Sequence, residues 1–123
     1  MNNATDILNI STKAENLALL AVAVCEYEQQ PPAAFPEINP RTVKEGLAVL
    51  LNDGMTALRE EITQAKLPGL YHHTLSAACA ATAALADMAI EAEDDEAYDE
   101  LCSFSYFVAD AVAKLAVELD EIS

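Results

Sequence analysis

Apolar residues recur at helical spacing in four stretches of this chain, and no stretch shows the strict alternation of a half-buried strand. The four stretches predict helices at about residues 12–30, 40–66, 70–92 and 95–121, with residues 1–11 as a polar and partly frayed start. The fourth stretch separates its two faces most cleanly, and its apolar stripe consists of Leu101, Phe104, Val108, Ala111, Val112, Leu115, Leu119 and Ile122.

Capping patterns and prolines set the expected boundaries of these helices. Residues 12–15 form a Thr-x-x-Glu capping box, which predicts the start of the first helix. The same helix is expected to end near Gln30, because the two prolines that follow force an extended backbone. Asn39 and Pro40 are an N-cap and a first-position proline, so the second helix is expected to begin there.

The second predicted helix contains two glycines, Gly46 and Gly54, each of which costs about 1 kcal/mol relative to alanine. They indicate either close approach of a neighbouring backbone or a break near Gly54. The apolar phase continues across Gly54, which favours an unbroken helix. The expected apolar stripe of this helix is Val43, Leu47, Leu50, Leu51, Leu58 and Ile62.

A chain of 123 residues is expected to form one domain with its own core. The connections between helices two, three and four are short, which makes these helices antiparallel neighbours, whereas a proline-rich connection joins helices one and two. The fold class is therefore predicted to be all-α, as a four-helix bundle or a close variant with mostly antiparallel helices.

Two of the helices have apolar or small residues on most sides. The first combines Leu17, Leu20 and Val24 with Leu19 and Val22 on other sides, and the third is rich in alanine. A helix that is apolar all round is usually central or covered by a second chain. One hypothesis is therefore a homo-oligomeric structural or regulatory protein, for example a homodimer.

The net charge of −15 is concentrated near the end of the chain, where residues 87–123 contain 12 acidic residues and only one basic residue, Lys114. A field of this sign repels nucleic acid and anionic lipid and attracts basic protein surfaces. The longest apolar run has nine residues, too short to span a bilayer. We therefore expect neither direct nucleic-acid binding nor a membrane partner.

Three cysteines, Cys25, Cys79 and Cys102, lie in apolar helical runs without a Cys-x-x-Cys pair. They are expected to be reduced, buried thiols in a cytoplasmic protein. The first ten residues contain no lysine or arginine, so no signal-peptide start is visible.

Seven carboxylates fall between residues 91 and 100, at the expected turn between helices three and four. Asp94 or Asp95 is expected to cap the fourth helix, and Glu96 gains from the helix dipole in its first turn. Local stability does not explain the others, since like charges four residues apart repel and acidic groups at a helix C-terminus are unfavourable. The carboxylates that a functional hypothesis has to use are Glu91, Glu93, Asp99 and Glu100.

The sequence predicts no catalytic residue, no metal site and no cofactor. His72 and His73 are adjacent, whereas zinc-binding histidines on one helix are three or four residues apart. There is no Ser-His-Asp arrangement and no glycine-rich phosphate loop. A magnesium-dependent hydrolase that uses the acidic cluster remains a weaker hypothesis, because its candidate ligands come from one junction and not from several facing helices.

The leading hypothesis is a non-enzymatic, acidic protein-binding module that docks onto a basic surface, such as that of a nucleic-acid-binding protein. The carboxylates would then stand in for phosphates, and the protein would act as a nucleic-acid mimic or inhibitor. This profile is similar in type to phage-borne inhibitors of host defence nucleases, including anti-CRISPR proteins, with which the chain shares no sequence motif. The expected partner-binding residues are Glu91, Glu93, Asp94, Glu96, Asp99, Glu100, Tyr106 and Phe107.

Overall fold

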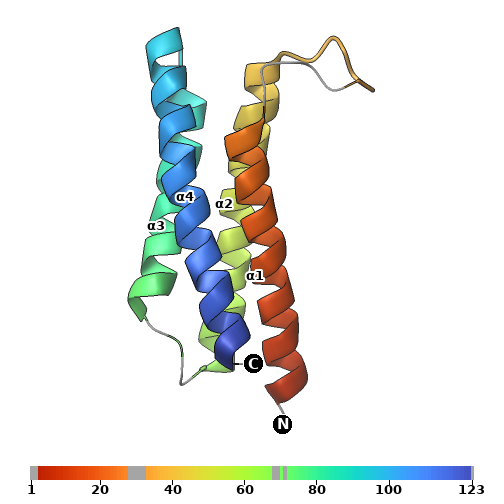
Figure 1. Ribbon diagram of the computed structural model, residues 1–123, viewed down its shortest axis with the longest axis vertical. Helices are drawn as coiled ribbons and strands as arrows, with labels where there is room; N and C mark the ends of the chain where they lie inside the picture. Colours follow the sequence, from red (N-terminus) through yellow and green to blue (C-terminus); the bar gives the residue numbers. More distant parts are fainter. Residues whose placement is uncertain (1–2, 28–32, 68–69, 71, 123) are drawn as a thin grey trace.

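The computed structural model describes residues 3–27, 33–67, 70 and 72–122, and these residues form a four-helix bundle (Figure 1). This confirms the predicted all-α fold class. The helices are α1 (Asn3–Glu26), α2 (Pro40–Ala65), α3 (His72–Glu91) and α4 (Asp95–Ile122).

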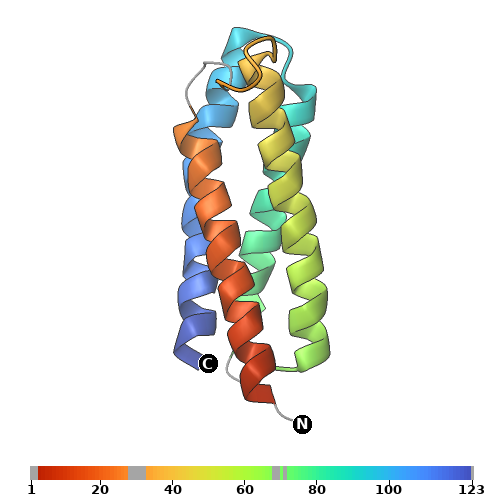
Figure 2. The same ribbon diagram turned by 90° about the vertical axis from the view of Figure 1, so that its right-hand side faces the viewer.

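Each helix packs on two neighbours. Helix α1 packs on α2 and α4, and α3 packs on the same two helices, so α1 and α3 occupy one diagonal of the bundle and α2 and α4 the other. The chain runs up and down, and both chain ends lie at the end of the bundle opposite the α1–α2 connection and the α3–α4 turn (Figures 1 and 2). The starts of α2 and α4 therefore share one end of the bundle.

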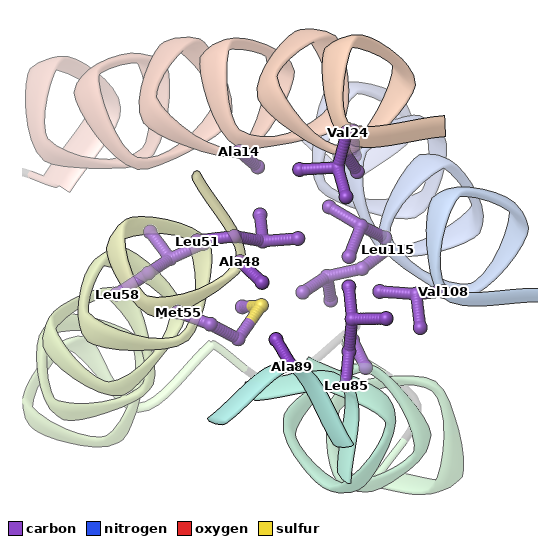
Figure 3. Packing of buried hydrophobic residues seen from close by; sticks show 14 of the residues in the cluster. Ala14, Val24, Ala48, Leu51, Met55, Leu58, Leu85, Ala89, Val108 and Leu115 are labelled. Carbon is purple, nitrogen blue, oxygen red and sulfur yellow. The ribbon is translucent and has the colours of Figure 1, made fainter. Parts of the chain in front are cut away.

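The side chains of the core converge from all four helices (Figure 3). Helix α3 contributes mainly small residues, which lets its neighbours approach closely. The fully buried apolar positions include Ala14 and Val24 of α1, Leu51 and Leu58 of α2, Ala78 and Leu85 of α3, and Val108, Val112, Leu115 and Leu119 of α4.

The start of α1 differs from the prediction. The helix begins at Asn3 and passes through residues 12–15 without interruption, so the predicted capping box does not start it. The predicted frayed start includes residues 1 and 2, which lie outside the described residues, whereas residues 3–11 are helical. Ile10 and Ala14 are buried one helical turn apart, and their packing extends the helix toward the N-terminus. At the other end α1 stops at Glu26, while Gln30 lies outside the described residues.

Helix α2 begins as predicted. The side chain of Asn39 accepts a hydrogen bond of 2.9 Å from the backbone N–H of Arg41, and Pro40 occupies the first helical position. The helix is continuous through Gly54, which confirms the favoured interpretation. It ends at Lys66, a left-handed residue with φ of 52° whose N–H donates to the carbonyl of Ile62 over 3.1 Å.

The buried stripe of α2 is rotated from the predicted one. Leu50, which belongs to the predicted stripe, is 59% exposed. Lys44, which does not, is only 1% exposed. The full stripe is Lys44, Ala48, Leu51, Met55, Leu58 and Ile62. A lysine therefore occupies the first core position of this helix.

Two helices, α1 over Ile7–Glu26 and α3 over its whole length, are long and apolar enough to cross a membrane by length and composition alone. Core helices of soluble proteins satisfy the same criterion. The longest uninterrupted apolar run is short because scattered polar residues divide each helix, although the mean hydropathy of each helix is high. The absence of a membrane partner stays a prediction.

Candidate functional site

The acidic junction between α3 and α4 is built around one capping residue. The Asp94 carboxylate accepts a hydrogen bond of 2.8 Å from the N–H of Ala97, and its carbonyl accepts one of 3.0 Å from the N–H of Tyr98. Asp94 is thus the N-cap of α4, one of the two candidates named from the sequence. The role of this carboxylate is explained by helix capping.

Asp95 has a partner from another helix. Its carboxylate forms an ion pair with the guanidinium of Arg41, which comes from the first turn of α2. The Asp95 side chain is 90% exposed, so the pair contributes little to stability, about 0–1 kcal/mol. Its main effect is to neutralise one charge of the junction.

Three other carboxylates share a shallow depression between α3 and α4, which we call the acidic groove. Its volume is about 530 Å³. The rings of Phe104 and Phe107 lie beside each other in it, with centroids 6.4 Å apart. The groove thus combines an aromatic surface with charged groups, and its lining residues are Met88, Glu96, Asp99, Glu100, Ser103, Phe104 and Phe107.

The groove carboxylates carry uncompensated charge. Within the described part of the chain, no ion pair involves Glu96, Asp99 or Glu100. Glu96 and Glu100 are four residues apart on one helix, which costs about 0.2–0.5 kcal/mol through repulsion. All three side chains belong to exposed residues. A cation or a basic side chain would therefore find an open, negative site.

The structure divides the predicted partner-binding residues. Glu96, Asp99, Glu100 and Phe107 meet in the acidic groove, together with Phe104 and Met88, which the prediction did not include. The remaining four are exposed but do not line the groove, and they are Glu91, Glu93, Asp94 and Tyr106. Of these, Asp94 is the N-cap of α4.

A second group of residues lies at the same end of the bundle, with Lys44 and Tyr98 buried, and we call it the end cluster: Arg41, Lys44, Tyr98 and Cys102. The Nζ atom of Lys44 lies 3.2 Å from Sγ of Cys102 and 5.7 Å from the centroid of the Tyr98 ring. The guanidinium carbon of Arg41 lies 4.7 Å from the same centroid. Arg41 and Lys44 of α2 thus both interact with one aromatic ring of α4.

The Tyr98 phenol is buried. The residue is 2% exposed, and its hydroxyl has no hydrogen-bond partner of normal geometry among the described residues. Burial raises the pKa of the phenol, and the adjacent Cys102 thiol raises it further, whereas the Arg41 guanidinium lowers it. Burial without a partner therefore favours the neutral phenol.

The other two cysteines do not belong to the end cluster. The Cys25 thiol donates a hydrogen bond of 3.0 Å to the backbone carbonyl of Ser105. Cys79 lines a depression between α2 and α3, and burial raises the pKa of its thiol, with a smaller opposing effect from Arg59. Within the described residues, no three His, Cys, Asp or Glu side chains lie close enough together to hold a metal ion.

Sequence reasoning missed the end cluster because its signal depends on topology. Arg41 and Lys44 are three residues apart on α2, and Tyr98 and Cys102 are four apart on α4, so each pair shares a helix face. Only the common orientation of α2 and α4 brings the two pairs together.

No protein-family model, curated protein or solved structure matches this chain. Its class is therefore defined by the fold alone, as an antiparallel four-helix bundle, and any function has to be argued from its own residues.

Proposed function

We propose that the protein is a non-enzymatic binding module whose acidic groove receives a basic surface of another protein. The observation that carries the proposal is that three unpaired carboxylates share one open groove with two aromatic rings. Aromatic side chains supply contact area at protein interfaces, and charges at the rim supply attraction and orientation. Phe107 is 71% exposed, which leaves its ring available to a partner.

A nucleic-acid-binding protein is the partner class that fits this groove. Carboxylates spaced along α4 present a row of negative charge, as phosphates do, and the net charge of −15 extends the attraction beyond the groove. In this function the protein competes with nucleic acid for the basic surface and so inhibits its partner. The same long-range field speeds association at low salt.

The direct test measures the binding of a labelled arginine- and leucine-rich helical peptide, and then of a purified basic nucleic-acid-binding protein in competition with duplex DNA. The groove variant combines Glu96→Gln, Asp99→Asn and Glu100→Gln. We expect it to bind about tenfold more weakly, since each exposed ion pair contributes roughly 0.2–1 kcal/mol. Binding by the unaltered protein is expected to fall strongly at about 1 M salt, where the screening length is roughly 3 Å.

The matched control removes three charges elsewhere, through Glu15→Gln on α1 and Asp53→Asn and Glu60→Gln on α2, all exposed residues outside the groove. It removes the same number of negative charges. If the control and the groove variant lose the same affinity, the groove is not the binding site and only the total charge matters. If duplex DNA does not compete, the mimic hypothesis is wrong.

A homo-oligomer is the second candidate function, and three exposed apolar side chains on one side of α1 favour it. Leu8, Leu19 and Val22 lie on one face of the helix and are all exposed. A second copy of the chain that packs on this face would cover them. Sedimentation equilibrium checks this: the protein should associate at micromolar concentration and the double variant Leu19→Gln, Val22→Gln should not.

A further inference from the structure

The buried amine of Lys44 has an unusual partner. The chain contains 21 acidic residues, yet none of the described carboxylates pairs with Lys44. The Nζ atom instead contacts the Cys102 thiol at 3.2 Å, with the Tyr98 ring as its other neighbour. Lysine is almost never fully buried unless it is paired with an opposite charge. A methionine of similar volume would fill the same core position without this desolvation cost.

The contact joins two helices that lie diagonally across the bundle, as the contacts of Arg41 with Asp95 and Tyr98 also do. Lys44 lies in the second turn of α2 and Cys102 in the second turn of α4, and these helices occupy one diagonal of the bundle. Lys44 thus spans the interior at the end opposite the chain termini. Cys102 is only partly buried, whereas Lys44 is 1% exposed.

We propose that Lys44 and Cys102 form an oxidative cross-link, with hydrogen peroxide or another hydroperoxide as the oxidant. In the first step the Cys102 sulfur takes one oxygen from the peroxide and becomes a sulfenic acid, and water is released. In the second step Lys44 releases its ammonium proton to water, and the resulting amine attacks that sulfur. The S–O bond breaks, an S–N bond forms, and the hydroxyl group leaves with one proton of the amine as a second water. The cysteine sulfur is oxidised and one peroxide is reduced.

The geometry favours Cys102 over the other two thiols. At 3.2 Å the nitrogen already lies in contact with sulfur, so the second step needs no rearrangement of the helices. The Cys25 thiol is buried and faces a backbone carbonyl. Burial raises the pKa of Cys79, which lowers the fraction of reactive thiolate there.

The cross-link has a structural consequence for the start of α4. Ser103 and Phe104, the next two residues after Cys102, line the acidic groove. A bond to α2 at this point fixes the helix turn that carries them. It also closes a loop between residues 44 and 102, which restricts the unfolded chain. Oxidation is therefore expected to raise the melting temperature by on the order of 10 °C.

The test treats the purified, reduced protein with increasing hydrogen peroxide and analyses tryptic peptides by mass spectrometry. We expect trypsin to stop cleaving after Lys44, and a peptide pair joined at Lys44 and Cys102 to appear with two hydrogens fewer than the separate peptides. A thiol reductant should reverse both changes and the rise in melting temperature. The Cys79→Ser variant serves as the control and should cross-link like the unaltered protein.

Two variants separate chemistry from folding. Cys102→Ser keeps a polar atom beside the amine and should lose the cross-link and the thermal shift, while its circular dichroism stays helical. Lys44→Arg keeps the positive charge and should give Cys102 sulfenic or sulfinic acid without a cross-link. The proposal is overturned if the unaltered protein shows oxidised Cys102 with Lys44 still cleaved by trypsin, or a disulfide between Cys25 and Cys102.

Discussion

Gly54 of α2 faces the side chain of Leu17 of α1 so closely that a Cβ atom added at Gly54 would lie 2.5 Å from Leu17 Cδ2. Gly46, two turns earlier in the same helix, has no such neighbour within 4 Å. The absence of a side chain at Gly54 therefore serves the contact between two helices. At Gly46 it serves no contact with the residues that the structure describes.

The two glycines give a matched pair of substitutions. We expect Gly46→Ala to raise the free energy of unfolding by about 1 kcal/mol, which is the difference in helix propensity. Gly54→Ala gains the same propensity, but the flexible tip of the partly buried Leu17 side chain has to shift, which offsets part of this gain. Urea denaturation should therefore place Gly54→Ala below Gly46→Ala, and equal midpoints would contradict the close approach.

Lys44 allows the cost of the buried amine to be separated from the packing of its aliphatic stem. Lys44→Met keeps the volume and removes the charge, so we expect unchanged or higher stability, by up to about 1 kcal/mol. Lys44→Ala leaves a cavity and should destabilise by about 2–4 kcal/mol. Guanidinium denaturation of both variants checks this. A loss in Lys44→Met as large as that in Lys44→Ala would show that the amine itself stabilises the fold.

The N-cap of α4 makes Asp94 the most important single carboxylate of the junction for stability. Asp94→Ala removes the acceptor for the Ala97 N–H, and we expect a loss of about 1 kcal/mol. The neighbouring control Glu93→Gln removes an exposed charge that no described hydrogen bond uses. It should leave the thermal midpoint unchanged or raise it slightly, since it reduces repulsion within the acidic cluster.

Tyr98 should make stability depend on pH on the alkaline side. The pKa of its phenol is raised in the folded state, so the unfolded chain loses this proton first as the pH rises. The corresponding stabilisation is complete below the ordinary value near pH 10 and is lost as the pH rises through the folded-state pKa. The control Tyr98→Phe should show a smaller alkaline loss in urea denaturation at matched pH values. At neutral pH it should be as stable as the unaltered protein or more so, because it removes a buried hydroxyl without a partner.

The helices could be predicted from the sequence because their breakers and stripes are local signals. Asn39 and Pro40 mark the start of α2 by chemistry that acts within one turn, and the structure confirms them. The start of α1 could not be predicted in the same way. There the burial of Ile10 against other helices outweighs a capping pattern that is valid only for an isolated segment.

The candidate site could be predicted only in part, for a related reason. Glu96, Asp99, Glu100 and Phe107 are close in sequence, so helical spacing alone places them near each other. The contribution of Met88 from α3, and the contact of Lys44 with Cys102, depend on which helix faces which. The apolar pattern predicted that Leu50 lies in the buried stripe of α2. In the bundle Leu50 is exposed, and the buried stripe begins at Lys44 instead.

The contact between α1 and α4 sets the order of events when the chain is made. These two helices are the farthest apart in sequence, yet they pack side by side along much of the bundle (Figure 2). During synthesis, Ala14, Ala21 and Val24 of α1 therefore emerge long before the helix that helps to cover them. The core formed by the three earlier helices stays exposed until α4 leaves the ribosome and packs on α1 and α3.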